Sequence, residues 1–572
     1  MNVNTEQYFS EVPHLHAPRS VFDRSFTHKT TMDVNKLYPI FIDEGLPGDS
    51  MKLKFQVFGR LLNPLVVPVM DELYFETLWF KSYMLILWDN TRKFFGERNN
   101  PSDDNDFVIP TINSGANGFA VGSIFDHFGL PVNVPNLTVN SLPLRMYNMC
   151  FNYWLRDQNL VNSVTFVTGD SDSASNYTIL KSAKMHDLFT SALPTSQLNG
   201  LPFSGSDGVT LPIAGTAPVA IYGVDKPVGF TYQGITDGLI NWHYGDSDRY
   251  NVSNQNYNKS NFSQAGSHAP ADPTKPFYLS SDPNWSGIKG TADLTQVAGI
   301  SVNDLRFMIS LQQFREKLLS NGHRYNEVIH TFFGVENYNE PYLPEFLGMT
   351  REMIDINTVI QTSSTDSTSP QGNLTAYGVV NSHESALSTS FRFHGYLLGI
   401  ARIRHNPVYQ QGLNKLWSRS VMLDFYNPMF NGLGEQPILN KEIMCQGGSV
   451  LNSAGEPVDD DAFGFNEAWY EYRYYPSLIT GQLRSGISQS LDVYHLAQYF
   501  GTIDSSTGIG TPALPVLNQS FIEENIPIGR SLSVEPDEEN GVPDFVMDFR
   551  FEYECARVMP VRNIPAGLYS GI

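Results

Sequence analysis

The strongest constraint on the fold is a strict two-residue alternation near the carboxyl end of the chain. Its apolar positions are Phe545, Met547, Phe549, Phe551, Tyr553 and Cys555, and the positions between them are Val546, Asp548, Arg550, Glu552 and Glu554. Because successive side chains of a strand point to opposite faces, the pattern predicts a strand with one buried face. A shift of one residue would bury three acids, so the register is strongly specified. The fold must then join this strand to distant parts of the chain.

Three other segments predict strands. Residues 51–57 (MKLKFQV) alternate in the same way. Residues 73–88 are apolar almost throughout, which favours a strand buried on both faces but leaves a helix open. A further strand is predicted within 388–405, with a common face formed by Phe391, Phe393, Leu397, Ala401 and Ile403. The predicted class is all-β.

One helix is predicted at Val302–Leu319, where apolar residues form a stripe at helical spacing. Ser301 and Asp304 fit a capping pattern at its start, and Gly322 follows its last turn. We expect this helix to pack on the sheet.

Composition changes along the chain predict its organisation. Residues 1–45 mix Pro, His and balanced charges without periodicity, which is typical of an extended arm. Residues 198–299 are rich in Gly, Ser, Asn, Asp and Pro, yet they carry aromatic residues such as Trp242, Tyr257 and Trp285. A structureless loop of this length is uncommon in a compact domain, so an ordered surface insertion is predicted. The segments 46–197 and 300–558 then form the two parts of the main domain, and 559–572 form a tail.

The charge of the chain limits its partners. A formal net charge of -22 excludes a surface that coats nucleic acid throughout, so any such contact is local. Charged residues make up 17% and aromatic residues 13%, a balance that suits large protein interfaces. The first residues lack the pattern of a secretory signal, and no apolar run is long enough to span a bilayer, so we expect a cytosolic product without membrane insertion. Cys150, Cys445 and Cys555 are predicted to be reduced and buried.

No common catalytic or cofactor motif occurs in the sequence, so neither an enzyme nor a cofactor is predicted. His14 and His16 lack a third metal ligand nearby, and Asp170 and Asp172 lack the later residues of a calcium loop. The acidic run at 459–461 could supply paired carboxylates, but adjacent side chains point apart, which favours a solvated turn.

Three cations in the arm are candidates for contact with single-stranded nucleic acid. They are Arg19, Arg24 and Lys29, which alternate with the rings of Phe22 and Phe26. Nearby acidic residues offset their charge, and the alternative is an arm that docks on a neighbouring copy of the chain.

Several blocks of sequence resemble the major capsid proteins of microviruses, especially of the gokushovirus type. They are PIFIDEGLPGDS at 39–50, LLNPLVVPVMDELYF at 61–75, LILWDNTRKFFGER at 85–98, HDLFTSALP at 186–194, RYNEVIHTFFGVENYNEPYLPEFLG at 324–348, YQQGLNKLWSRS at 409–420, LGEQPILNKE at 433–442, FGFNEAWYEYRYYPSLITGQLRS at 463–485 and SLDVYHLAQYF at 490–500. The blocks follow the family's order from about residue 20 to the carboxyl end, and the 198–299 insertion matches poorly.

The resemblance implies a single eight-stranded antiparallel jelly roll of the viral capsid type, with long insertions and a few short helices. It also implies a T=1 icosahedral shell around a circular single-stranded DNA genome, assembled in the cytoplasm of a bacterial host. The implied partners are other copies of the chain, a small basic DNA-packaging protein, a minor pilot protein and a host-surface receptor. In similar viruses the insertion projects from the shell and serves attachment, which makes Trp242, Tyr257 and Trp285 candidate receptor contacts.

The aromatic run 469–475 (WYEYRYY) is a candidate subunit interface through Trp469, Tyr470, Tyr472 and Tyr474, because such side chains combine apolar area with a polar tip. The alternative is that the run belongs to the core. Two other functions compete with the capsid hypothesis, namely a jelly-roll carbohydrate-binding or adhesion protein and a β-rich glycoside hydrolase. Both are normally exported, whereas no export signal is visible.

Overall fold

The computed structural model describes residues 18–98, 100, 102, 106–195, 310–314, 317, 343–365, 371–372, 374–382, 385–504, 506–533 and 542–562, and the backbone of seven short strands between 220 and 291. The chain divides into two compact units. The first joins Met1–Leu198 to Phe314–Ile572, and the second is Asn199–Gln313.

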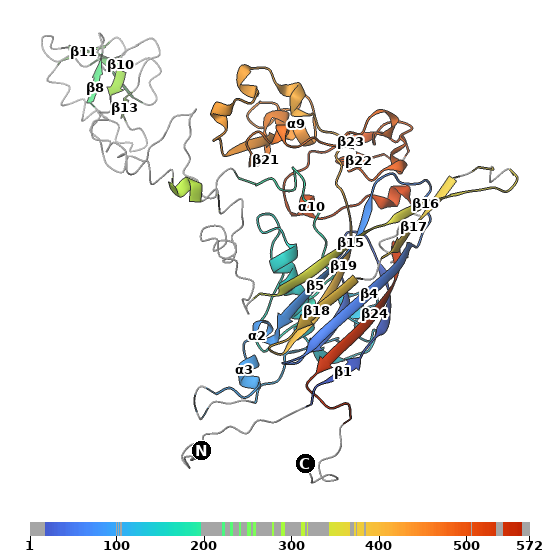
Figure 1. Cartoon of the computed structure of the whole chain (residues 1–572). Coiled ribbons are helices and arrows are strands. Elements are labelled where there is room, and N and C mark those ends of the chain that lie inside the picture. Colours follow the sequence, from blue (N-terminus) through green and yellow to red (C-terminus); the bar gives the residue numbers. More distant parts are fainter. Residues whose placement is uncertain are drawn as a thin grey trace. The chain divides into compact units, whose positions relative to one another are not determined.

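Two antiparallel sheets form the centre of the first unit (Figure 1). The strands of the seven-stranded sheet are β1 (Ser20–Asp23), β2 (Phe26–Met32), β4 (Ser50–Leu61), β16 (Asp355–Ile360), β17 (Leu374–Asn381), β18 (Ser385–Ser390) and β24 (Phe545–Arg557). β24 pairs with β4 on one side and with both β1 and β2 on the other. β4 also pairs with β17 and β18, and β16 follows β17.

The four-stranded sheet has the order β15-β5-β19-β3. Its strands are β3 (Tyr38–Gly45), β5 (Leu73–Tyr83), β15 (Glu345–Met353) and β19 (Gly395–His405). Long connections leave this sheet twice, between β5 and β15 and between β19 and β24. Most of the short helices and small sheets lie in these two connections.

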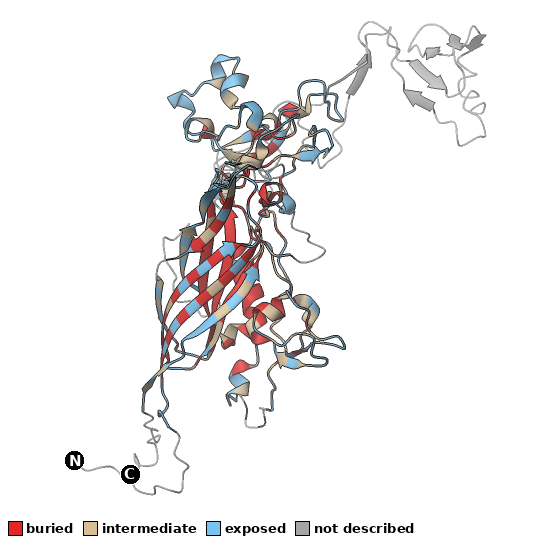
Figure 2. Ribbon diagram, turned by 90° about the vertical axis from the view of Figure 1, so that its right-hand side faces the viewer, coloured by how far each residue is buried: buried red, intermediate tan, exposed pale blue. Residues whose placement is uncertain are grey.

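An apolar core fills the space between the two sheets. Phe55 of β4 meets Trp79 of β5 with ring centroids 5.1 Å apart, and Phe551 of β24 lies 6.4 Å from the same tryptophan. The buried positions of β24 are those that alternation predicts, and the positions between them face away from the core. Figure 2 shows this change from buried to exposed along the strands. The strands predicted at 51–57 and 545–555 are therefore confirmed.

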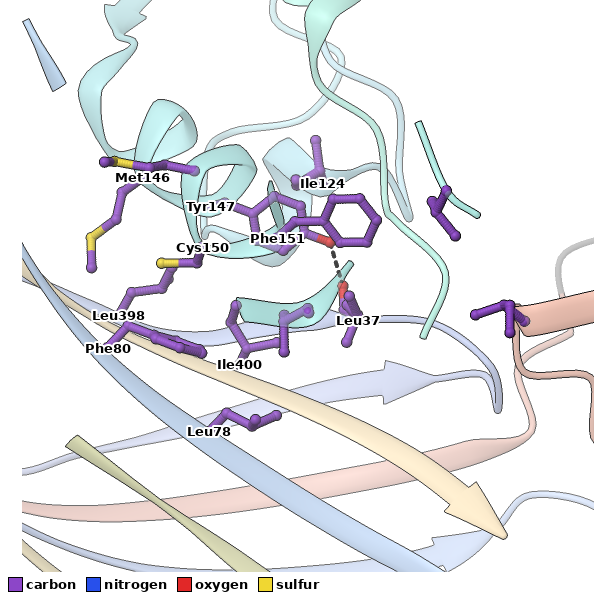
Figure 3. Packing of buried hydrophobic residues seen from close by; sticks show 14 of the residues in the cluster. Leu37, Leu78, Phe80, Ile124, Met146, Tyr147, Cys150, Phe151, Leu398 and Ile400 are labelled. Carbon is purple, nitrogen blue, oxygen red and sulfur yellow. Dashed lines mark hydrogen bonds between the residues drawn. The ribbon is translucent and has the colours of Figure 1, made fainter. Parts of the chain in front are cut away.

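A second apolar cluster covers the outer face of the four-stranded sheet. Tyr147 and Cys150 of helix α5 (Leu142–Cys150) pack over Phe80 of β5 and Leu398 and Ile400 of β19 (Figure 3). The Tyr147 hydroxyl donates a hydrogen bond of 2.8 Å to the carbonyl oxygen of Leu37, and burial raises its pKa. Because both faces of this sheet are covered, β5 and β19 are buried along almost their whole length.

The remaining helical elements are short. The α-helices are α2 (Met84–Leu87), α3 (Thr91–Phe94), α4 (Ile124–His127), α9 (Asn440–Ile443) and α10 (Gln519–Ile522), and a π-helical turn (Phe151–Leu155) extends α5. The 3-10 turns are Ala174–Asn176, Lys415–Ser418, Met422–Asp424, Pro428–Phe430, Val458–Asp460, Tyr470–Tyr472, Gly481–Leu483, Asp492–Tyr494 and Ile528–Ser531. None of the helices in the described part of the chain combines the length and the apolar composition that a membrane span requires.

Small antiparallel strand pairs and one three-stranded sheet complete the secondary structure. In the first unit they are β6 (Thr111–Asn113) with β7 (Thr138–Asn140), β20 (Glu435–Leu439) with β21 (Ala462–Glu467), and β22 (Gly501–Ile503) with β23 (Gly510–Pro512). The second unit contains β8 (Ala220–Gly223) with β14 (Ile288–Thr291), β11 (Arg249–Val252) with β12 (Gln255–Asn258), and a sheet of β9 (Gly229–Tyr232), β10 (Leu239–Asn241) and β13 (Phe277–Leu279). The chain is thus mostly β with a few short helices, as predicted.

The predicted arm at 1–45 needs correction. Residues 20–45 form β1, β2 and β3, and Met32, Leu37 and Phe41 are buried. Strands β1 and β2 have mixed sequences, and they are strands because β24 offers an edge for pairing. Residues 1–17, including His14 and His16, lie outside the described part of the chain.

Other predictions differ in detail. The strand predicted within 388–405 is two strands, β18 and β19, and Phe393 between them is exposed. The stretch 73–88 is a strand to Tyr83 and then the helix α2. Cys445 is exposed rather than buried. Most of the helix predicted at Val302–Leu319 lies outside the described residues. The described residues within this range, 310–314 and 317, are helical.

Candidate functional site

The three candidate cations lie at the β1 and β2 edge of the seven-stranded sheet, and each has a partner in the chain. Arg19 donates a hydrogen bond of 2.7 Å to the Ser50 hydroxyl. Arg24 forms an ion pair with Asp43 of β3, and its guanidinium lies 5.4 Å from the centre of the Tyr553 ring. The ammonium of Lys29 lies 2.8 Å from the Asp548 carboxylate, with both side chains exposed. Exposed pairs of this kind contribute about 0–1 kcal/mol, so Lys29 can exchange its partner at little cost.

The face of the seven-stranded sheet that points away from the core carries charges of both signs. Across the β4–β24 register, Glu552 stands opposite Lys54 and Glu554 opposite Lys52. Arg550 lies 3.2 Å from Glu552. Cross-strand pairs of opposite charge contribute about 0.2–1 kcal/mol each. This face therefore carries charges that largely offset one another, together with exposed apolar side chains such as Phe58 and Val546, although the chain as a whole is strongly acidic.

The aromatic run 469–475 is divided between core and surface. Trp469 and Tyr470 are buried, and the Tyr470 hydroxyl donates to the Glu442 carboxylate at 2.6 Å. Burial and the Glu442 charge raise the pKa of Tyr470. Tyr472 is 51% exposed, and the Arg419 guanidinium lies 4.5 Å from the centre of its ring. Tyr474 is half-buried, and burial and Asp187 raise its pKa to about 12.

The candidate receptor contacts lie in the second unit. Trp242 and Trp285 are outside the described residues. Tyr257 belongs to β12, of which only the backbone is described.

The acidic residues considered for chemistry make structural bonds. Asp172 pairs with Arg145 at 2.8 Å with both side chains fully buried, and Asp170 accepts from the Trp88 indole at 2.6 Å. Asp459 accepts from the backbone amides of Gln446 and Gly447 at 2.8 and 2.7 Å. Burial raises the pKa of Asp459, but these amides lower it more, so it stays below its usual value. Within the described ranges, no group of three or more His, Cys, Asp or Glu side chains could hold a metal ion.

A buried charge cluster joins three strands of the four-stranded sheet. The Glu76 carboxylate of β5 lies 2.7 Å from Arg402 and 2.9 Å from Arg404 of β19, and 2.6 Å from Arg351 of β15. Burial would raise the pKa of Glu76, but Arg402 and Arg404 outweigh it, so the pKa is lowered. Burial and the charge of Arg404 lower the pKa of Arg402 to about 10. The cluster links the three strands through ion pairs, and the apolar and polar pattern of the sequence does not predict it.

A second buried group lies where β19 ends. His405 and Glu524 are fully buried with Nδ1 and Oε1 3.0 Å apart. Lys184 donates to the Gln498 amide oxygen at 2.9 Å, and its ammonium lies 4.2 Å from the centre of the Phe521 ring. Burial lowers the pKa of Lys184 to about 8, although Glu524 and Asp187 act in the opposite direction.

Residues 415–434, here called the 415–434 segment, form a surface feature that sequence reasoning did not identify. Ten of its large apolar side chains are exposed, namely Leu416, Trp417, Val421, Met422, Leu423, Phe425, Tyr426, Met429, Phe430 and Leu433. Apolar residues in a non-periodic sequence give no signal of burial or exposure, so only the structure distinguishes them from core.

Comparison with known proteins finds one matching family model and several similar proteins. A family model described as "Capsid protein (F protein)" matches residues 10–567. The chain is 39% identical over 573 residues to "Capsid protein VP1" of Bdellovibrio phage phiMH2K, with 98% of each chain covered. It is 37% identical to "Capsid protein VP1" of Chlamydia phage 1 and 30% identical to that of Spiroplasma virus 4, with 97% of each chain covered in both cases.

Proposed function

The chain belongs to the family of phage capsid proteins described as "Capsid protein (F protein)", and from this premise we propose that its copies close into a T=1 icosahedral shell around a circular single-stranded DNA genome. As a capsid protein of a phage it is a structural component of the virion that assembles with copies of itself. The observation that carries the proposal is the match over residues 10–567, which spans both sheets and both long connections.

We further propose that the two sheets are the two halves of an eight-stranded viral jelly roll. In chain order the eight strands are β2, β3, β4, β5, β15, β17, β19 and β24. One sheet holds the order β2-β24-β4-β17 and the other the order β3-β19-β5-β15. Consecutive strands mostly alternate between the sheets, which supports a double-sheet roll of the kind common in capsids. In this scheme β1, β16 and β18 are additions to the seven-stranded sheet.

The genome contact is proposed at the β1 and β2 edge, through Arg19, Arg24 and Lys29. Their pairing with Ser50, Asp43 and Asp548 means that DNA would have to replace weak internal bonds. The net charge of -22 leaves most of the genome's charge to other cations, which supports a small basic DNA-packaging protein as a partner.

The test of this contact uses Arg19→Gln with Lys29→Gln, which spares the Arg24–Asp43 pair. We expect particles with a lower DNA content, measured by the ratio of absorbance at 260 and 280 nm after nuclease treatment. Arg473→Gln is the matched control, because Arg473 is also exposed and paired, with Glu467. An unchanged DNA content in the double variant would refute the genome contact.

Host attachment is proposed for the insertion at 198–299, with Trp242, Tyr257 and Trp285 as candidate contacts to a host-surface receptor. Support comes from its separation as a compact unit, since a unit with its own contacts can vary without disturbing the two sheets. Exchange of the insertion for that of a relative should change which cells adsorb the particles. Unchanged adsorption would place attachment elsewhere, with the minor pilot protein as the next candidate.

Assembly itself is tested by expressing the chain in bacterial cytoplasm, alone and with the other virion proteins. Uniform icosahedral particles in sedimentation and negative-stain microscopy are the expected result. The size of the particles then tests the T=1 proposal directly. If only monomers or small oligomers form under both conditions, the shell is excluded.

The same assembly assay tests the interface roles proposed for Tyr472 and Tyr474. The buried Trp469 and Tyr470 would act by supporting these two side chains.

A further inference from the structure

The 415–434 segment presents an unusually apolar surface. Its ten exposed apolar side chains include Trp417, Met422 and Met429, which are 76%, 85% and 87% exposed. Four of the ten are aromatic side chains of roughly 150–250 Å² each, and together with the six smaller Val, Leu and Met side chains they expose apolar surface on the order of 1,000 Å². Monomers rarely expose contiguous apolar patches above a few hundred Å². The segment therefore has the composition of a surface that another molecule covers.

Its backbone is held in place by side-chain hydrogen bonds. The Asn414 amide oxygen accepts from Leu416 N at 2.9 Å, and the Asn427 amide oxygen accepts from Met429 N at 3.0 Å. The Asp424 carboxylate accepts from Ser420 N at 2.7 Å. These bonds set the 3-10 turns that direct the apolar side chains outward. An ordered surface loses less conformational entropy on binding than a flexible one.

The charge of the segment indicates which molecule covers it. Only Lys415, Arg419 and Asp424 are charged, and the two cations lie 3.9 and 3.6 Å from Glu442 and Glu471. Two copies of a chain with net charge -22 repel each other electrostatically. The repulsion at a contact is smallest where each surface carries few charges. The exposed area also reaches the roughly 800 Å² that each partner contributes to a stable interface.

We infer that the 415–434 segment is a contact surface for a second copy of this chain. The inference rests on the proposed shell and names one of its contacts. A cavity of about 310 Å³ adjoins the segment, lined among others by Arg419, Leu423, Leu433 and Glu471. Nε of Arg419 and both carboxylate oxygens of Glu471 are buried without a hydrogen-bond partner in the described part of the chain.

The first experiment is peroxide footprinting of the wild-type chain, which requires no substitution. Met70 is 75% exposed and lies outside the segment, so in free subunits it should be oxidised about as fast as Met422 and Met429. In assembled particles we expect the oxidation of Met422 and Met429 to slow by about tenfold or more, because oxidation needs an accessible thioether. Mass spectrometry of peptides measures all three rates.

The outcomes separate the two proposals. If Met422 and Met429 react equally fast in particles and in free subunits, the contact is refuted while the shell stands. If they are protected only in complete virions and not in particles of this chain alone, another virion protein covers the segment and the inference fails. If no particles form either alone or with the other virion proteins, the shell and the contact are both refuted.

A substitution provides the second test. Met422→Asp with Met429→Asp places two carboxylates on the segment, and Met70→Asp is the matched control. We expect the double variant to remain a folded subunit by circular dichroism and to lose particle formation in sedimentation, while Met70→Asp still assembles. Wild-type particle yield from the double variant, or equal loss in the control, would overturn the inference.

Discussion

The two sheets of the first unit differ in how many of their faces are covered. The seven-stranded sheet packs one face on the core and leaves the other exposed, so β4 and β24 alternate strictly between buried and exposed residues. The four-stranded sheet packs its inner face on the same core and its outer face under helix α5 and the long connections. Its strands β5 and β19 are buried almost throughout. Whether one face of a strand is buried or both therefore decides how clearly its sequence alternates between apolar and polar residues.

Covering a second face changes where charge can be placed. In the seven-stranded sheet charges occupy the exposed face as weak pairs, such as Lys29 with Asp548. In the four-stranded sheet Glu76 is buried and surrounded by three arginines, so its charge is balanced inside the protein. An exposed charge is solvated by water whatever its partner, whereas a buried one depends on its partners. Substitutions of the same chemistry should then have very different effects on the two sheets.

The largest effect is expected for Glu76→Gln. The substitution keeps the shape of the side chain but leaves Arg402 and Arg404 buried without a counter-charge. Removing one partner of a buried pair costs about 3–5 kcal/mol. Denaturant unfolding of the unassembled subunit, followed by circular dichroism, measures the loss. A loss below about 1 kcal/mol would mean that the cluster is far better solvated than its burial indicates.

A smaller loss is expected for Gly399→Ala in β19. A Cβ atom at Gly399 would lie 2.7 Å from the Trp79 ring and 3.2 Å from Cβ of Phe41, so the core between the sheets would have to shift. Overpacking of this kind costs about 1–3 kcal/mol. Thermal unfolding of the subunit measures it, and Gly432→Ala is the control because no atom lies within 4 Å of a Cβ placed there. Equal midpoints for both variants would contradict tight packing around Gly399.

A pH effect should come from the covered side of the four-stranded sheet, where Lys184 is buried. Its folded pKa of about 8 lies below the usual value of 10.5, so between these pH values the unfolded chain binds more protons. Stability therefore rises as the pH increases from 8 to 10, by about 1–2 kcal/mol for one group. The measurement is the free energy of unfolding at both pH values for the wild type and for Lys184→Met. The same rise in both proteins would show that Lys184 is not its source.

The smallest effect is expected for Glu552→Gln on the exposed face of β24. Its partners Lys54 and Arg550 remain accessible to water, so the free energy of unfolding should change by about 0.5 kcal/mol or less. High salt should reduce even this difference, because exposed pairs are screened. A loss comparable to that of Glu76→Gln would remove the distinction between the two sheets.

In the aromatic run 469–475 and the 415–434 segment, as in the sheets, the structure decides which apolar side chains are buried. The aromatic run 469–475 was predicted as either interface or core, and the structure divides it, with Tyr470 buried and Tyr472 exposed. Within the 415–434 segment, only residues 415–420 and 433–434 belong to blocks that resemble the family, yet the whole segment carries ten exposed apolar side chains. Composition identifies apolar side chains, but it does not show whether they are buried in the core of their own chain or at an interface with another molecule.

The sequence by itself determined the β class, the strands at 51–57 and 545–555 and the family, because alternation and long blocks of similar residues are local patterns. Only the tertiary structure decided that β1 and β2 are strands and not an arm, since they depend on the edge of β24. It also decided the Glu76 cluster, whose residues are brought together from three strands up to 328 positions apart. Pairing and charge balance over such distances depend on which faces meet, and that information is absent from any local window of sequence.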